Sequence, residues 1–313
     1  MSQFSFRGVL PAMQVPFRAD HSIDEPELRR YTSWLAGIRG ITGLVTNGHT
    51  GEVFALDAEE RAEVTRIVAD EVKGRIPVVS GICVEGISEA CEHAVMAKRA
   101  GASGLLVMPP HQWLRFGMRA EHVVEHFTEI GKASGLDLVV HVYPSWTRAA
   151  YSCEVLAQLA RLPWVKVFKV GTRDMNKYVM DINAIREAAP EKTVLTCHDE
   201  YLLASMVQGV DGALVGFASF IPHKIVALWE AVQAGDLKKA MGIQFEINPL
   251  KQAVYGFGEP TGEAHARMKM AMFLAGLMSS PVVRRPINQP AGAELETIRQ
   301  ALAGAGMLQK AAA

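Results

Sequence analysis

Eight short runs of apolar residues recur along the chain, and a segment with helical periodicity follows each of them. Within the runs the apolar residues are nearly continuous, which is typical of parallel strands that are buried on both faces. Eight strand-then-helix units in series predict a (β/α)8 TIM barrel. The eight runs are 8–17, 41–48, 76–82, 104–110, 136–144, 165–171, 193–197 and 212–218.

More helical sequence follows the eighth run than a barrel needs to close. We therefore expect a barrel over residues 1–225 and additional C-terminal helices over 226–313 that pack on it. An open doubly wound sheet is the competing architecture, but the Gly-rich dinucleotide turn is missing after the first strand. The additional helical patterns span 221–235, 237–256, 263–277 and a tail from 294 that frays toward the C-terminus.

The composition narrows the class of protein. Of the 313 residues, 49% are hydrophobic and 21% charged, and the formal net charge is −1. These values support a large core and give no electrostatic reason to expect nucleic acid or an anionic membrane as a partner. The longest apolar stretches are too short for a transmembrane helix, and the first residues lack the layout of a signal peptide. The four cysteines are scattered and form no CxxC pair, so we expect free thiols and a cytoplasmic location.

Lys169 lies near the end of the sixth apolar run, VKVFKVGT. A charge in a strand core is costly, so the lysine either extends to solvent or serves as a reactive amine. Active-site residues of a barrel lie at the carboxyl ends of the strands, which favours the second interpretation. A neutral amine there attacks a carbonyl to give an imine. Lys166 falls on the opposite face of the strand, near its start, and is interpreted as structural.

The turn NGHTGE, residues 47–52, follows the second run. Its glycines free backbone N–H groups, and Thr50 adds a hydroxyl beside a helix start, which together could hold a carboxylate or phosphate. The alternative is a tight strand-to-helix turn with a capping threonine, and the motif alone does not separate the two.

Four histidines also map to strand ends, and converging imidazoles could bind zinc. No HxH or HExxH spacing supports a metal site, and few carboxylates accompany these histidines apart from Glu52 and Asp199. We therefore expect no metal and no cofactor, but a metal-dependent barrel enzyme remains an alternative. The four are His49, His111, His141 and His198.

Motifs spread over nearly the whole chain resemble those of the dihydrodipicolinate synthase / N-acetylneuraminate lyase family of class I aldolases. They include GVLPAMQVPF, GHTGE, AGASGLLVMPP, GVDGALVGFAS and MKMAMFLAGLMSSPVVRRPI. The resemblance implies a barrel with C-terminal helices, a homo-oligomer (a tetramer or a dimer), and a Schiff base between a lysine and pyruvate or another 2-oxo acid. By position, Lys169 matches the imine-forming lysine. Thr50 matches the second hydroxyl residue of the carboxylate-binding pair, with Gly48 and Gly51 in the same turn.

The chain departs from the family pattern around the proposed imine. His141 replaces the tyrosine that relays protons, while Tyr143, one residue before the proline, is expected on the other strand face. His49 replaces the first threonine of the pair, and His111 and Gln112 replace the tyrosines after the fourth strand. An imidazole at residue 141 suits proton transfer near neutral pH.

Trp146 stands where the synthase has an arginine that holds the second substrate's carboxylate. An indole offers an apolar wall in place of a charge-assisted hydrogen bond. We therefore expect a class I lyase, an aldolase or hydro-lyase, that is not a true dihydrodipicolinate synthase and whose second substrate is an apolar or aromatic aldehyde. A 2-oxo acid binding protein with weak catalysis is a further alternative. The predicted catalytic residues are Lys169 and His141, and the predicted substrate-binding residues are Gly48, His49, Thr50, Gly51, His111, Gln112, Trp146, His198 and Leu214.

Overall fold

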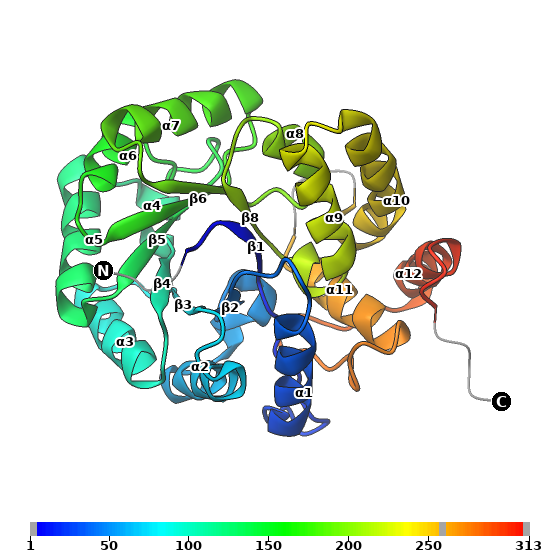
Figure 1. Ribbon diagram of the computed structural model, residues 1–313. Helices are drawn as coiled ribbons and strands as arrows, with labels where there is room; N and C mark the ends of the chain where they lie inside the picture. Colours follow the sequence, from blue (N-terminus) through cyan, green and yellow to red (C-terminus); the bar gives the residue numbers. More distant parts are fainter. Residues whose placement is uncertain (1–4, 257–260, 309–313) are drawn as a thin grey trace.

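A computed structural model describes residues 5–256 and 261–308 of the chain. Within these residues, eight parallel strands form one sheet in the order β1-β8-β7-β6-β5-β4-β3-β2. The sheet closes between its first and last members, since Thr42 N donates to Val9 O at 3.0 Å and Met13 N donates to Val45 O at 2.9 Å. The predicted (β/α)8 barrel is confirmed (Figure 1). The strands are β1 (Gly8–Pro11), β2 (Leu44–Thr46), β3 (Val78–Ile82), β4 (Gly104–Val107), β5 (Asp137–Val142), β6 (Val165–Val170), β7 (Thr193–Thr196) and β8 (Gly212–Val215).

Helices surround the barrel, and local sequence signals start several of them. Asp57 and Glu60 form a capping box at the start of α2 (Ala58–Val72), and Pro222 occupies the first turn of α9 (Pro222–Gln233), where its missing N–H costs nothing. The other helices that follow the strands are α1 (Glu25–Ala36), α3 (Ile87–Arg99), α4 (His111–Phe116), α5 (Ala120–Ser134), α6 (Cys153–Ala160), α7 (Met175–Ala188) and α8 (Leu202–Met206). The 3-10 turns are η1 (His49–Gly51), η2 (Val53–Ala55) and η3 (Phe217–Ser219).

Additional helices follow the barrel, as predicted. They are α10 (Leu237–Tyr255), α11 (Glu263–Leu274) and α12 (Gly292–Gly304). These helices contact one another, and α10 also packs on α9, so the extension lies along one side of the barrel (Figure 1, yellow to red). The division of the chain at residue 225 stays a prediction, and the last residues of the expected fraying tail lie outside the described residues.

The apolar side chains of the strands divide between the barrel interior and the helix layer. The interior holds a buried cluster that includes Leu106, Val139, Val167, Leu195 and Leu214. Because side chains alternate along a strand, Lys169 faces the same interior as Val167, one layer nearer the carboxyl end. The sheet therefore directs this lysine into the mouth of the barrel.

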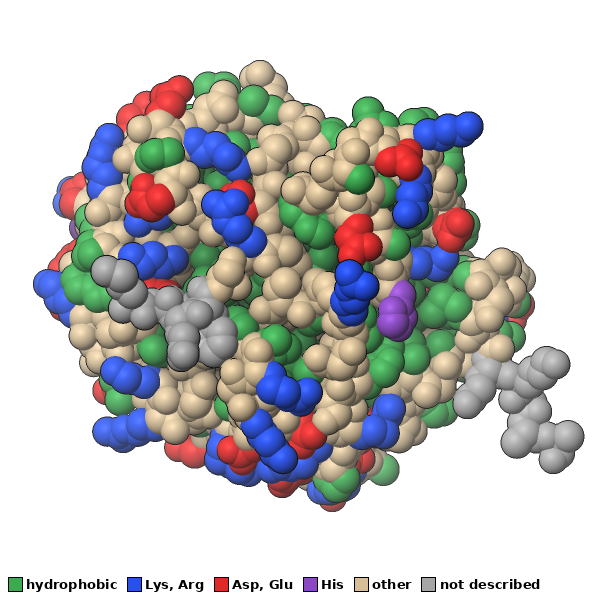
Figure 2. All heavy atoms as spheres, viewed as in Figure 1, with side chains coloured by type: hydrophobic (Ala, Val, Ile, Leu, Met, Phe, Trp, Pro, Cys, Tyr) green, Lys and Arg blue, Asp and Glu red, His purple; other side chains and the backbone are tan. Residues whose placement is uncertain are grey.

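The face of the molecule in Figure 2 has no large region of charge of one sign. Acidic and basic side chains are interspersed over the face shown in Figure 2. In the part of the chain that the structure describes, every helix is too short or too polar to cross a membrane.

Candidate active site

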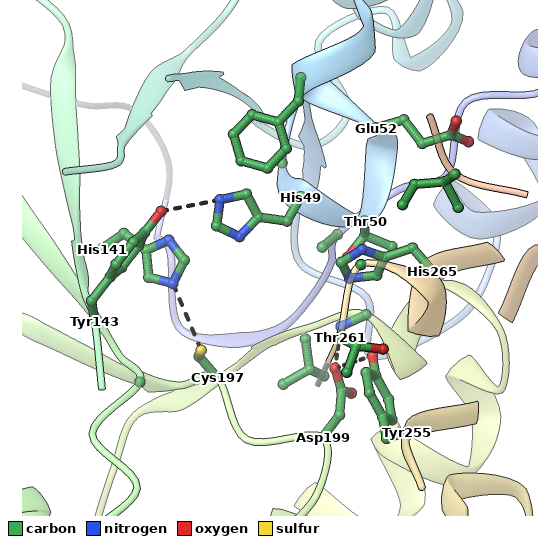
Figure 3. Close-up of a pocket in the computed structure, with 18 of the residues that line it drawn as sticks. His49, Thr50, Glu52, His141, Tyr143, Cys197, Asp199, Tyr255, Thr261 and His265 are labelled. Atoms are coloured by element: carbon green, nitrogen blue, oxygen red, sulfur yellow. Dashed lines mark hydrogen bonds between the residues drawn. The ribbon is translucent and has the colours of Figure 1, made fainter. Parts of the chain in front are cut away.

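A cavity of about 450 Å³ lies at the carboxyl ends of the strands (Figure 3). Leu106 and Leu214 belong to the interior cluster and also line the cavity, so they form its floor. The loops after the strands contribute the barrel side of the wall. Tyr255, at the end of α10, and His265, in α11, contribute the opposite side. The cavity is therefore shared between the barrel and the C-terminal helices.

Lys169 and His141 are neighbours in this cavity. They are paired in register across β5 and β6, and both line the cavity. The pKa of His141 lies well below its ordinary value because the side chain is buried and because the charge of Lys169 opposes a second positive charge. The same two causes lower the pKa of His49 to about 3 and that of His265 to about 4. Three neutral imidazoles therefore surround the lysine.

Tyr143 also lines the cavity, and its hydroxyl lies 3.1 Å from His49 Nε2. Burial raises the pKa of Tyr143 well above its ordinary value, so the phenol keeps its proton and shares a hydrogen bond with the neutral imidazole. The expectation that Tyr143 turns away from the cavity is wrong. Strand β5 ends at Val142, so strict alternation of side chains no longer applies one residue later.

The turn after β2 forms η1 on the cavity wall. Thr50 is buried against the cavity, and the backbone N–H groups of His49 and Thr50 donate no hydrogen bond within the described residues. Glu52, at a positive φ of 55°, ends this turn. Its carboxylate accepts from the fully buried ammonium of Lys269 and from the Arg284 backbone N–H at 2.9 Å. The C-terminal segment thus fixes the geometry of the turn.

Two carboxylates occupy the wall after β7. Asp199 accepts from the N–H groups of Gly216 and Phe217, at 2.9 and 2.8 Å, and from the Tyr255 hydroxyl at 2.8 Å. Burial outweighs these donors and raises the pKa of Asp199 to about 6. Glu200 forms a buried ion pair with Arg173 at 2.9 Å. Together these contacts tie the ends of β6, β7 and β8 to α10.

The dihydrodipicolinate synthetase family model matches residues 5–305. The chain belongs to this family. It is 30% identical to the 4-hydroxy-tetrahydrodipicolinate synthase of Nitrobacter hamburgensis over 308 residues, which cover 98% of this chain and 99% of that protein. It is 31% identical to the synthase of the same name from Methanoculleus marisnigri over 307 residues, with 96% and 100% covered.

Solved structures of a dihydrodipicolinate synthase and of an N-acetylneuraminate lyase share the fold. The chloride-inhibited dihydrodipicolinate synthase of Acinetobacter baumannii complexed with pyruvate is 25% identical, with a TM-score of 0.86 over 97% of this chain and 100% of that one. N-acetylneuraminate lyase from Fusobacterium nucleatum is 22% identical, with a TM-score of 0.83 over 97% and 99%. The resemblance inferred from sequence motifs is confirmed.

Most of the site residues predicted for this family member line the cavity. They are Gly48, His49, Thr50, His141, Trp146, Lys169 and Leu214. Gly51 does not, and its role is close packing, because a Cβ there would lie 2.9 Å from Met13 O.

Three other predicted residues also lie off the cavity wall. The backbone N–H groups of His111 and Gln112 bind the Glu85 carboxylate, and the His111 ring packs against Phe54 outside the wall. His198 is fully buried against Tyr178, with ring centroids 5.0 Å apart. Strand β7 ends at Thr196, and Cys197, one residue before His198, takes the place on the cavity wall.

The separation of these histidines removes the donor set on which the zinc alternative depended. Among residues 5–256 and 261–308, no three His, Cys, Asp or Glu side chains come close enough to hold a metal ion. His49 and His141 are near each other, with ring centroids 5.6 Å apart. His111 and His198 do not line the cavity that these two share.

Sequence reasoning missed several residues of the cavity. Tyr255, Thr261 and His265 come from the C-terminal helices and the segment between them, far from any strand end. Arg173, four residues after Lys169, also lines the cavity but lies beyond the end of β6. Only Arg173 carried a local signal, a charge shortly after a strand end; the helix residues carried none.

The buried histidines predict a pH dependence of stability. Each has a folded-state pKa below its ordinary value of 6.5, so the unfolded chain takes up protons that the folded chain refuses. We expect the free energy of unfolding to fall as the pH drops below 6.5 toward 4, by up to ~1.4 kcal/mol per pH unit for each histidine. Asp199 has the opposite effect on the free energy of unfolding. Its pKa is raised to about 6, so the folded chain binds this proton at a higher pH than the unfolded chain does. The histidines are His49, His126, His141, His198 and His265.

Urea unfolding midpoints at pH 7.5, 6.5 and 5.5 measure this dependence. A His126→Leu variant removes one of the buried imidazoles away from the cavity and should flatten the slope by one proton. Equal midpoints at pH 7.5 and 5.5 would contradict the prediction.

Proposed function

We propose that this protein is a Schiff-base-forming lyase that acts on a 2-oxo acid such as pyruvate. The observation that carries the proposal is the position of Lys169, inside the cavity of a family member and directly beside His141. The amine attacks C2 of the oxo acid, water leaves, and the resulting iminium accepts the electron pair of a breaking bond on C3. Cleavage of the C3–C4 bond, or loss of water from an adduct on the same scaffold, then gives a lyase reaction.

The turn at Gly48–Thr50 supports binding of the oxo acid's carboxylate. The Thr50 hydroxyl and the N–H groups of His49 and Thr50 offer donors on the wall of the cavity that Lys169 also lines. The Glu52 carboxylate of the same turn is bound by the Lys269 ammonium. The Acinetobacter synthase was solved as a complex with pyruvate, which favours the same small acid here.

His141 moves protons in the proposed reaction. Retro-aldol cleavage requires a base for the C4 hydroxyl proton and an acid that returns a proton to C3. His141 is neutral and adjoins Lys169, so it can take a proton when the iminium charge is lost. The hydrogen-bonded pair of Tyr143 and His49 adjoins it, with the Tyr143 ring centroid 4.9 Å from that of His141.

The second substrate is proposed to be an apolar or aromatic aldehyde, which distinguishes this protein from its relatives named as synthases. Phe54, Leu114, Tyr143 and Trp146 line the cavity and give it aromatic and aliphatic surface. A cavity of about 450 Å³ has room for such a group beside a three-carbon acid. The homo-oligomeric state and the cytoplasmic location stay predictions.

Borohydride trapping tests the proposed function. Incubation with pyruvate and sodium borohydride, followed by peptide mass mapping, should place a reduced adduct on Lys169. Lys166→Met is the matched control, since Lys166 lies on the same strand but outside the cavity. This variant should form the same adduct on Lys169 as the wild type. Failure to trap any 2-oxo acid on Lys169 would overturn the proposal. An adduct with a thermal shift but no turnover of any aldehyde would identify a binding protein instead.

Trp146→Arg should change the choice of the second substrate. Trp146 lines the cavity and is 69% exposed, so a guanidinium can replace the indole without entering the core. A charge-assisted hydrogen bond to an anionic aldehyde should raise its kcat/KM relative to an aromatic aldehyde by roughly 10-fold. Competition assays with pyruvate measure the ratio. Trp146→Phe, which keeps an aromatic ring, should leave the preference in place.

A further inference from the structure

Cys197 contacts His141 on the wall of the cavity. Its Sγ lies 3.8 Å from His141 Nε2, within hydrogen-bond reach of a thiol (Figure 3). Gly171, directly after β6, leaves room for the sulfur, since a Cβ there would lie 3.2 Å from Sγ and 2.7 Å from Val142 O. The backbone thus seats the thiol beside the imidazole.

The two ring nitrogens of His141 have different surroundings. Nε2 faces Cys197, and Nδ1 is enclosed and has no hydrogen-bond partner in the described residues. Cys197, by contrast, lines the cavity and is partly exposed to it. Cys197 therefore lies where it can pass a proton between His141 and a ligand in the cavity.

The charges around Cys197 suit this path. Burial raises the pKa of the thiol, so at rest the proton stays on sulfur, while the positive charges of Lys169 and Arg173 favour the thiolate form. A neutral imidazole accepts a proton better than a thiol sulfur does, so the resting hydrogen bond runs from S–H to Nε2. The resting pair is thus a thiol donor and an imidazole acceptor.

We propose that Cys197 is a catalytic residue that carries protons between His141 and the carbon next to the imine. This inference rests on the proposed function. When the iminium on Lys169 loses a C3 proton, that proton binds Sγ as the thiol's own proton passes to Nε2. The C3–H electron pair forms the C2=C3 bond of the enamine, and the iminium nitrogen becomes neutral. One positive charge moves from the iminium to the imidazolium, so atoms and charge balance.

The charge changes in the proposed relay also agree with the electrostatics around His141. The charge of Lys169 is one of the causes that keep His141 neutral. Formation of the enamine removes that charge at the moment when His141 receives the proton. Reversal of the steps returns the proton to C3 and regenerates the iminium.

Exchange of the pyruvate methyl protons in D₂O, followed by ¹H NMR, tests the relay without knowledge of the second substrate. Cys197→Ala should slow this exchange by about 10²-fold or more, since the loss of a positioned base has that size. Borohydride trapping on Lys169 should remain complete, because the nucleophile is untouched. Cys197→Ser, whose hydroxyl can relay a proton, should recover part of the exchange rate.

Cys91→Ala is the control, since Cys91 lies on the outer helix α3, away from the cavity, and should exchange at the wild-type rate. An exchange rate in Cys197→Ala equal to that of the wild type would overturn the inference. An exchange rate lowered equally in Cys197→Ala and Cys197→Ser, while both variants still trap pyruvate, would also overturn it. If wild type itself traps no 2-oxo acid, the proposed function fails instead, so the two failures are distinguishable.

Discussion

A Lys169→Met variant is expected to lose turnover of every 2-oxo acid substrate by roughly 10⁴-fold or more, since removal of a covalent nucleophile has that effect in other enzymes. Methionine has a similar length and no amine, so the cavity keeps its shape while imine formation becomes impossible. Steady-state kinetics and borohydride trapping measure the loss. Turnover and borohydride trapping should be lost together, because both depend on the same amine.

The fold should survive this change. Lys169 faces the cavity, and its charge opposes protonation of His49 and His141, so its removal takes away an interaction that disfavours the protonated imidazoles. We therefore expect a circular dichroism spectrum and an unfolding midpoint close to those of wild type. Lys166→Met should retain full turnover. Substantial turnover in Lys169→Met would contradict the assignment of the nucleophile.

Lys269→Met is expected to have the largest effect on stability. The Lys269 ammonium is completely buried and donates to the carbonyls of Val15 and Val282, at 2.8 and 3.1 Å, and to the Glu52 carboxylate. It also lies 4.5 Å from the centroid of the Phe17 ring. Truncation leaves a nearly buried carboxylate without its counter-charge, which costs about 3–5 kcal/mol of unfolding free energy. Urea unfolding at pH 7.5 measures this loss.

Two further experiments show whether removal of the Lys269 charge causes the loss of unfolding free energy. Glu52→Gln combined with Lys269→Met removes the uncompensated carboxylate and should recover part of the stability. Lys132→Met breaks a solvent-exposed pair with Glu129 and should cost less than about 1 kcal/mol. If Lys132→Met and Lys269→Met cost the same, the buried ion pair does not hold the turn in place.

The repeating parts of the fold could be predicted from the sequence, because their signal is local. Buried strands need continuous apolar residues, so all eight were found, and alternation then places Lys169 beside Val167 on the interior face. The same rule failed at Tyr143, where the strand has already ended. Short loops after strands follow no fixed period, so a residue's direction there depends on the tertiary contacts that hold the loop.

The helix side of the cavity could not be predicted. His265 and Tyr255 reach the cavity only because α10 and α11 pack on the barrel, and no local pattern encodes that packing. The contact between Cys197 and His141 is similar, since it joins residues 56 positions apart and depends on the gap left by Gly171. Long-range contacts of this kind require the assembled structure.

The division of the cavity wall between barrel and extension also has a consequence for the evolution of such a protein. The proposed nucleophile and proton carriers belong to the barrel, whereas His265, Thr261 and Ile287 belong to the extension. Substitutions, insertions or recombination in the extension can therefore alter which molecules fit while the chemistry stays intact. Such changes need not touch any reacting group, provided that Lys269 keeps the extension attached to the turn.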